Sequence, residues 1–162
     1  NCPLLSPADE LIDASGCVLL PGLVNAHTHA AMTLFRGSAD DMELQPWLEE
    51  KIWPVERRLT PEDVHWGTML AIAEMLRAGV TCFNDMYHFP EAGARAAIET
   101  GIRMCPSGVL LGFLPDAEDL LREAVAFCEE FREAGDGRIT PMLAPHAPYT
   151  CPRPMLEKVI AA

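Results

Sequence analysis

The chain has 162 residues, 49% of them hydrophobic, and a formal net charge of −12 from 24 acidic and 12 basic residues. This balance argues against nucleic-acid and anionic-membrane partners, which require a basic surface. No apolar run approaches the roughly 18 residues of a membrane span. The six cysteines contain no C-x-x-C pair, which favours free, mostly buried thiols in a reducing cytoplasm.

Strand and helix signals alternate along the first half of the chain. The stretch 11–20 predicts a short strand or two, and 23–29 predicts a buried strand introduced by a Pro-Gly turn. An acidic connection over 40–59 leads to a helix with Thr60 as N-cap and Pro61 at its first position. The predicted apolar face of that helix, which ends at Gly79, consists of Val64, Met69, Ile72, Ala73 and Leu76.

The second half continues the alternation. Strands are predicted at 80–86, within 102–111 with Pro106 at the downstream end, and at 139–143; helices are predicted at 90–100, stopped by Gly101, from an N-cap at Asp116 to Gly135, and at 155–162. The apolar face of the helix after Asp116 is expected to comprise Leu120, Ala124, Phe127, Cys128 and Phe131. This order, with strands buried on both faces, predicts a parallel sheet and an α/β fold.

Two histidines at the end of the first predicted strand are the strongest chemical signal. Residues i and i+2 of a strand share a face, so His27 and His29 would present two imidazoles side by side. Such a pair suits a divalent metal with nitrogen ligands. The alternative is two histidines in a polar loop.

Four stretches extend this signal over nearly the whole chain: PGLVNAHTHAAMTLFRG (21–37), DDMELQPWLEEKIWPVERRL (40–59), AGVTCFNDMY (78–87) and APHAPYTC (144–151). In this order they resemble the amidohydrolase superfamily, in the branch of methylthioadenosine/S-adenosylhomocysteine deaminases and triazine chlorohydrolases. The resemblance implies the N-terminal half of a (β/α)8 TIM-type barrel. Residues 1–20 would be a remnant of a small β-sandwich and 21–162 the first four β/α units. Because such a barrel needs about 250 residues, the chain is expected to be a fragment.

The resemblance also implies a metal and a reaction. His27 and His29 would bind one divalent metal, zinc first, with Fe²⁺ or Mn²⁺ as alternatives. A zinc-bound hydroxide would deaminate an adenosine-like substrate. The third histidine, the proton-shuttling glutamate and the metal-binding aspartate of the family belong to the fifth and eighth strands, so this chain alone is expected to be inactive. The stretch 140–146 lacks the bridging lysine of binuclear relatives, which favours a mononuclear site.

Two further residues match substrate-binding positions of the family. Glu56 is expected to accept hydrogen bonds from ribose hydroxyls, although an ion pair with Arg57 and Arg58 is the alternative. His146 is expected to contact the substrate and help polarise the reacting centre, the alternative being a core histidine. Asp85 is interpreted as structural, because the family takes its metal carboxylate from the last strand.

The remaining candidate residues give weaker indications of function. His65 and His88 are interpreted as surface residues, whereas Trp47 and Trp53 are expected to wall the pocket. Ser107 stands where relatives that accept S-adenosylhomocysteine are expected to have an arginine, which favours methylthioadenosine or another uncharged analogue.

Other hypotheses remain open. They are a chlorohydrolase or deaminase of triazine or guanine-type heterocycles, and a non-catalytic fragment that serves as an assembly partner. The expected partner is a small nucleoside-like molecule, homo-oligomerisation is left open, and the expected location is the cytoplasm.

Overall fold

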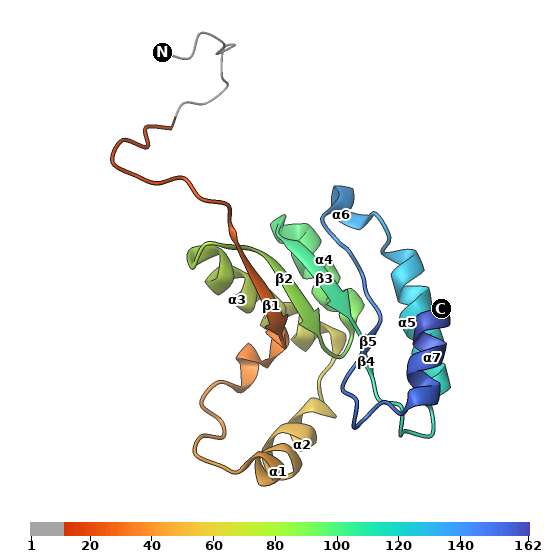
Figure 1. Ribbon diagram of the computed structural model, residues 1–162. Coiled ribbons are helices and arrows are strands. Elements are labelled where there is room, and N and C mark those ends of the chain that lie inside the picture. The colour runs from red at the N-terminus through yellow and green to blue at the C-terminus, as the bar shows by residue number, and fades with distance from the viewer. Residues whose placement is uncertain (1–11) are drawn as a thin grey trace.

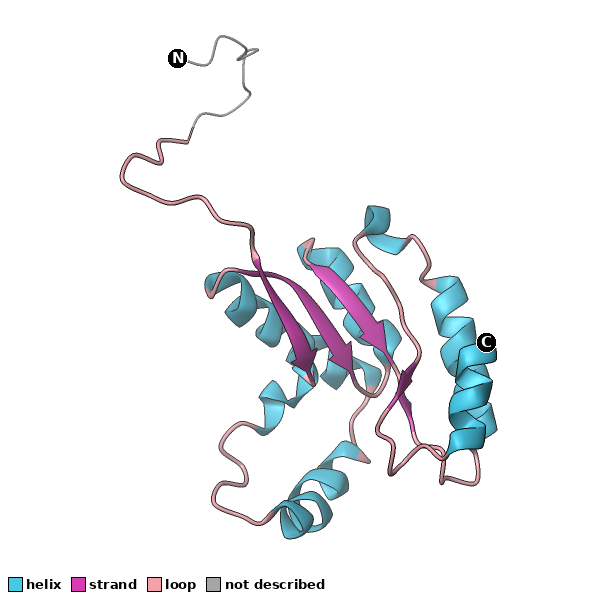
Figure 2. Ribbon diagram, in the orientation of Figure 1, coloured by secondary structure: helices cyan, strands magenta, loops and turns pink. Residues whose placement is uncertain are grey.

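The structure is a computed structural model that describes residues 12–162. Strands and helices alternate over most of this range (Figures 1 and 2). The strands are β1 (Leu23–Thr28), β2 (Val80–Met86), β3 (Arg103–Ser107), β4 (Val109–Leu110) and β5 (Ala144–Pro145). The α-helices are α1 (Leu44–Pro46), α2 (Trp53–Glu56), α3 (Pro61–Arg77), α4 (Pro90–Thr100), α5 (Ala117–Glu130), α6 (Ala134–Gly137) and α7 (Arg153–Ala161); η1 (Ala30–Phe35) is a 3₁₀-helix and η2 (Trp47–Ile52) a π-helix.

All strand pairs are parallel, which confirms the predicted α/β class. A three-stranded sheet has the order β1-β2-β3, and β4 pairs with β5. A bridge between Met104 and Ile139 continues the pairing from β3 to the segment that leads into β5. Figure 1 shows α3 and α4 covering one face of β1–β3. The carboxyl ends of the strands therefore lie along one edge, where α/β proteins place their functional groups.

The fourth predicted strand differs from the observed one. Thr140 N–H donates to Met104 O at 2.9 Å and Met142 N–H donates to Pro106 O at 3.0 Å, yet regular strand is confined to β5. The segment predicted as a strand at 139–143 thus pairs with β3 through alternate residues without forming a regular strand. The strand predicted within 102–111 likewise divides into β3 and β4.

The helix boundaries largely agree with the sequence. The Thr60 hydroxyl accepts a hydrogen bond from the backbone of Asp63 at 3.2 Å, and the Asp63 carboxylate accepts one from Thr60 N–H at 2.8 Å. This capping box starts α3 at Pro61, as predicted. Asp116 does precede α5, but its side chain makes no capping hydrogen bond. The expected final helix begins two residues early, in α7.

The apolar face predicted for α3 is wrong in part. Val64 and Ile72 are buried, but Leu76 is 45% exposed. The other buried positions of α3 are Gly67, Thr68, Ala71 and Met75. Gly67, Thr68 and Ala71 are small, and α3 contacts η1 and α4 as well as the sheet; the Thr33 hydroxyl, for example, donates to Gly67 O at 2.7 Å. Close helix contacts, not hydrophobicity, decide which side of α3 is buried.

On α5 the expected face is shifted in a similar way. Ala124, Phe127 and Phe131 are buried as predicted, whereas Leu120 and Cys128 are only partly covered. Leu121 and Ala117 are buried in their place. The main core joins α5 to α3, α4 and β2 around Phe83.

The sequence predicted that the first strand is buried on both faces, and this prediction is wrong. Leu23 and Val24 are 60% and 68% exposed, because β1 is an edge strand and no helix covers its second face within residues 12–162. The strands expected over 11–20 are also missing from residues 12–20, which form a turn at Ser15 and otherwise irregular backbone. Leu11 and the rest of residues 1–11 lie outside the described part, so the β-sandwich remnant at 1–20 stays a prediction.

The connection at 40–59 is more helical than predicted, since it contains α1, η2 and α2. Five cysteines are free thiols, as expected, but only Cys151 is buried. Cys82, Cys105 and Cys128 are partly covered, Cys17 is exposed, and Cys2 lies outside the described residues. No helix in residues 12–162 combines the length and apolar character needed to cross a membrane.

Candidate functional site

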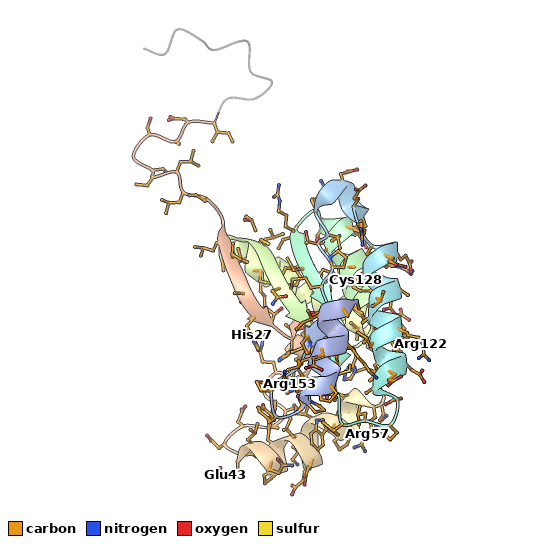
Figure 3. All side chains as sticks on the ribbon, turned by 45° about the vertical axis from the view of Figure 1, so that its right-hand side comes forward. His27, Glu43, Arg57, Arg122, Cys128 and Arg153 are labelled. Carbon is orange, nitrogen blue, oxygen red and sulfur yellow. The ribbon has the colours of Figure 1, made fainter. Side chains whose placement is uncertain are left out.

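The predicted metal-binding histidines lie together at the carboxyl end of β1. Their ring centroids are 5.1 Å apart and their planes nearly perpendicular. Figure 3 places His27 at that end of the strand, on the side of the molecule where Glu43 and Arg57 mark the helical segment after β1. The i, i+2 spacing therefore delivers the side-by-side imidazoles that the sequence predicted.

One of these rings is held by its neighbouring strand. Nδ1 of His29 lies 2.8 Å from the carbonyl oxygen of Met86, at the end of β2. Because a carbonyl only accepts, Nδ1 carries the proton and Nε2 keeps its lone pair. Metal-binding histidines are oriented by this kind of contact in general. His29 is thus prepared to bind a cation through Nε2, while the exposed ring of His27 adds a second nitrogen.

The residues present fit part of a metal site. Residues 12–162 contain no group of three or more His, Cys, Asp or Glu side chains that could hold a metal ion. A catalytic zinc normally has three protein ligands and one open position. Two nitrogens at the end of β1 thus fit a divalent metal whose remaining ligands come from elsewhere.

Asp85 does not complete this set. It is 5% exposed, and its Oδ1 accepts hydrogen bonds from the Thr28 hydroxyl and from Ala30 N–H, both at 2.7 Å. Burial raises the pKa of Asp85, while these hydrogen bonds and the two nearby histidines oppose the shift. The carboxylate fixes the backbone on either side of His29, which supports its structural interpretation.

Glu56 is turned towards the end of β2 rather than towards Arg57 or Arg58. The Tyr87 hydroxyl donates to Glu56 Oε1 at 2.9 Å, and the side chain of Glu56 is only 14% exposed. Nε2 of His88 lies 4.0 Å from Oε2. The alternative considered for Glu56, an ion pair with the two arginines, is therefore wrong.

Tyr87 links this glutamate to the histidine pair. Its ring centroid lies 6.3 Å from that of His29, and the residue is 3% exposed. Burial, and then the charge and hydrogen bond of Glu56, raise the pKa of Tyr87, so its phenol stays protonated and donates. Sequence reasoning missed this residue. Its position directly after β2, where barrel enzymes place functional groups, was the available signal.

His146 follows β5, as expected, and its backbone N–H donates to Leu110 O at 3.1 Å. Its ring is exposed, and Nδ1 lies 3.0 Å from the hydroxyl oxygen of Thr150, so the core-histidine alternative is wrong. Within the described residues His146 contacts neither the histidine pair nor Glu56. The structure places His146 at the same edge of the sheet as the histidine pair and Glu56, but not in contact with them.

The side chain of Ser107 is buried within the sheet. It is 2% exposed, and its hydroxyl donates to Asp85 O at 2.9 Å, which ties β3 to β2. A side chain at this position serves strand pairing, so the substrate preference drawn from the missing arginine has no support in the structure.

Four residues remain, two of them histidines expected at the surface and two of them tryptophans expected to wall a pocket. The side chain of His65, expected at the surface, is only 22% exposed on α3, with Nε2 3.5 Å from Glu99 Oε2; His88 is half-exposed. Trp53 is 37% exposed and Trp47 partly buried.

A cavity of about 340 Å³ opens beside Tyr87 and His88. Its other lining residues come from α4, α5 and the start of β4: Phe89, Pro90, Glu91, Gly108, Val109, Leu110, Leu120, Glu123, Ala124 and Phe127. Neither Trp47 nor Trp53 lines this cavity. A larger cavity of about 430 Å³ lies between α5 and α7, away from the histidines.

Comparison with known proteins places these features in a wider group. A family model described as "Amidohydrolase family" matches residues 18–162. The 5-methylthioadenosine/S-adenosylhomocysteine deaminase of Dictyoglomus thermophilum is 53% identical over 152 residues, which cover 94% of this chain and 36% of the relative. The enzyme of the same name from Pelotomaculum thermopropionicum is 53% identical over 149 residues, 92% of this chain and 34% of the relative. The chain thus spans about a third of the length of these relatives.

Solved structures agree in fold. An adenosine deaminase from Xanthomonas campestris with bound zinc superposes with a TM-score of 0.79 at 42% identity, over 87% of this chain and 33% of that protein. An atrazine chlorohydrolase from Arthrobacter aurescens, complexed with zinc, gives 0.76 at 17% identity, over 88% and 38%, a likeness of fold alone.

Proposed function

This chain belongs to the amidohydrolase family, and we propose that it is the N-terminal part of a metal-dependent aminohydrolase. The substrate class we propose is an adenosine-like nucleoside such as 5′-methylthioadenosine or S-adenosylhomocysteine, the substrates in the names of the relatives. The observation that carries the proposal is the contact between His29 Nδ1 and Met86 O, which leaves Nε2 free at the strand end beside His27.

The metal would be held by Nε2 of His29 and by the ring of His27, together with ligands that these residues do not supply. When bound, a divalent cation, zinc first and Fe²⁺ or Mn²⁺ as alternatives, makes water nucleophilic at neutral pH. Zinc is favoured because the solved structure of the similar adenosine deaminase contains it. We propose a single metal, since 140–146 contains no lysine that could bridge two.

The chain's own residues would bind and orient the nucleoside. Glu56 is acceptor-only and so can take hydrogen bonds from ribose hydroxyls. His146, at the same edge of the sheet, would contact the base. The favoured location of the enzyme is the cytoplasm, and its partner a small molecule.

A triazine or guanine-type heterocycle is the alternative substrate. It lacks ribose, so it would give the partly buried carboxylate of Glu56 no hydroxyl to bind. Likeness to the triazine hydrolases, at 17–19% identity, concerns the fold alone. The position of Glu56 against Tyr87 therefore favours the nucleoside.

The test is an ultraviolet time course of methylthioadenosine deamination with added zinc. We expect no turnover by the 162-residue chain, because two histidines do not complete a catalytic site. We expect turnover by the longer protein that carries it, lost in His27→Ala. Turnover by the short chain would overturn the conclusion that its metal site is incomplete. A longer protein active only on triazines would overturn the nucleoside assignment, and one inactive on every amine heterocycle would favour the non-catalytic role.

A further inference from the structure

A buried tyrosine, which no comparison assigns a role, sits against the proposed substrate-binding carboxylate. We propose that Tyr87 is the positioning residue of this site: its hydroxyl holds Oε1 of Glu56 and leaves Oε2 to accept a hydrogen bond from a substrate hydroxyl. The assignment of Oε2 to a ribose-type hydroxyl rests on the proposed function, whereas the hold of Tyr87 on Glu56 does not.

The chemistry of the pair suits this role. A carboxylate only accepts hydrogen bonds, and a protonated phenol is a neutral donor. Tyr87 can therefore orient Glu56 without cancelling its charge, as an arginine would. Arg57 and Arg58 follow directly in the sequence, yet neither forms an ion pair with Glu56 among the described residues. The full negative charge of Glu56 stays available to a ligand.

Tyr87 is anchored, whereas the segment that carries Glu56 is not. The backbone N–H of Tyr87 donates to Ser107 O at 3.1 Å, and its ring packs with Ala31, Val64 and Ala92 in a buried cluster. Glu56 ends α2, and no residue of α2 is buried. The 2.9 Å hydrogen bond therefore fixes a residue of an exposed segment to the rigid end of β2.

The second carboxylate oxygen has no hydrogen bond among the described residues. The closest charged group is Nε2 of His88, whose 4.0 Å distance from Oε2 exceeds that of a hydrogen bond. Tyr87 and His88 also line the cavity of about 340 Å³. Glu56 itself is not among the residues that line this cavity. Its partly buried carboxylate oxygen without a hydrogen-bond donor nevertheless fits a ligand with a hydroxyl, such as the diol of a ribose.

The kinetic test uses the longer protein that carries this chain, with methylthioadenosine and its 2′,3′-dideoxy analogue as substrates. Tyr87→Phe should raise KM for methylthioadenosine about tenfold, the effect of losing a hydrogen bond to a charged group, with kcat unchanged. It should leave KM for the dideoxy analogue unchanged. The double variant with Glu56→Gln should behave as Glu56→Gln alone, because both changes act on one interaction.

The matched control is Tyr149→Phe, which removes the chain's only other tyrosine hydroxyl from a residue that is 85% exposed. It should change neither substrate's KM. A Tyr87→Phe effect of equal size on both substrates, or one that adds fully to Glu56→Gln, would overturn the assignment of Oε2 to a substrate hydroxyl.

A spectroscopic test decides the hold on Glu56 whatever the substrate. In the Tyr149→Phe version of the 162-residue chain, Tyr87 is the only tyrosine, so the tyrosine doublet in ultraviolet resonance Raman spectra reports its hydroxyl alone. The doublet should indicate a strong donor and should change in the additional variant Glu56→Ala. An unchanged doublet would overturn the positioning role. Failure of every nucleoside substrate, with the doublet behaving as expected, would overturn the proposed function but not the hold.

Discussion

The Nδ1 atom of His29 lies 2.8 Å from the carbonyl oxygen of Met86, so the end of β2 orients the ring that follows β1. This contact fixes the tautomer and directs the free nitrogen away from the strand pair. The parallel pairing of β1 with β2, in which Thr28 is the partner of Asp85, is what brings the two residues together. A property of the sheet thus prepares the metal-binding nitrogen.

The histidine pair predicts which substitutions weaken metal binding. His27→Ala and His29→Ala should each weaken zinc binding by the longer protein at least about tenfold, because each removes a nitrogen ligand. The control is His65→Ala, whose ring lies on α3 against Glu99. Competition with a chelator of known affinity measures the effect. Equal weakening by all three variants would mean that the strand-end pair does not bind the metal.

The structural interpretation of Asp85 predicts that its substitution lowers stability without removing a metal ligand. Asp85→Ala leaves the buried N–H of Ala30 without its acceptor, which should lower the free energy of unfolding by about 2 kcal/mol. Asp85→Asn retains an oxygen at the same place and should cost less. Urea unfolding measures both. If Asp85→Asn kept the stability but lost zinc, Asp85 would be a metal ligand and its structural interpretation would be wrong.

The elements that could be predicted are those with local signals. Helix α4 occupies 90–100 as expected, because Pro90 opens it and Gly101, at φ +78°, ends it. Strand β2 follows from its β-branched and aromatic run. The buried face of α3 could not be predicted, since it depends on which small residues allow η1 and α4 to approach.

The same limit applies to the candidate site. The two histidines follow from an i, i+2 spacing, which is local. The contact between Glu56 and Tyr87 joins residues 31 positions apart, so no spacing rule predicts it. Ser107 shows the same dependence on the sheet: its side chain bonds to the backbone of Asp85, a contact between strands that the sequence does not indicate.

Close packing of α3 on η1 predicts opposite outcomes for two helical glycines. A Cβ at Gly67 would lie 2.7 Å from the carbonyl oxygen of Ala31, a backbone atom that cannot move alone. Gly67→Ala should therefore lower the free energy of unfolding by about 1–3 kcal/mol despite its better helix propensity. A Cβ at Gly93 would meet the flexible end of Met104 at 3.1 Å and the hydroxyl oxygen of Thr68 at 3.8 Å, which is an ordinary contact distance.

Gly93→Ala is thus the control for Gly67→Ala, and its gain in helix propensity of up to about 1 kcal/mol should make it neutral or stabilising. Thermal unfolding of the two variants compares them directly. Equal destabilisation would show that α3 and α4 tolerate a methyl group equally, and that Gly67 is not required for the contact with η1.

The capping box of α3 predicts a dependence of stability on pH. Hydrogen bonds from the hydroxyl and backbone of Thr60 lower the pKa of Asp63 below its ordinary value of 3.8. Because the folded-state pKa is the lower one, the stabilisation is present above 3.8 and is lost as the pH falls through the folded-state value. Asp63→Ala should therefore lower Tm at neutral pH, and the difference from the unchanged chain should shrink in acid.

Glu62→Ala supplies the matched control, because Glu62 is also an acid in the first turn of α3 but makes no hydrogen bond to the cap among the described residues. It should lose only a weak interaction with the helix dipole. If Tm fell equally in the two variants and with the same pH profile, negative charge alone would stabilise the start of α3. A larger, acid-sensitive loss confined to Asp63→Ala would assign the effect to the reciprocal hydrogen bonds with Thr60, which also fix where the segment after Glu56 turns into the helix.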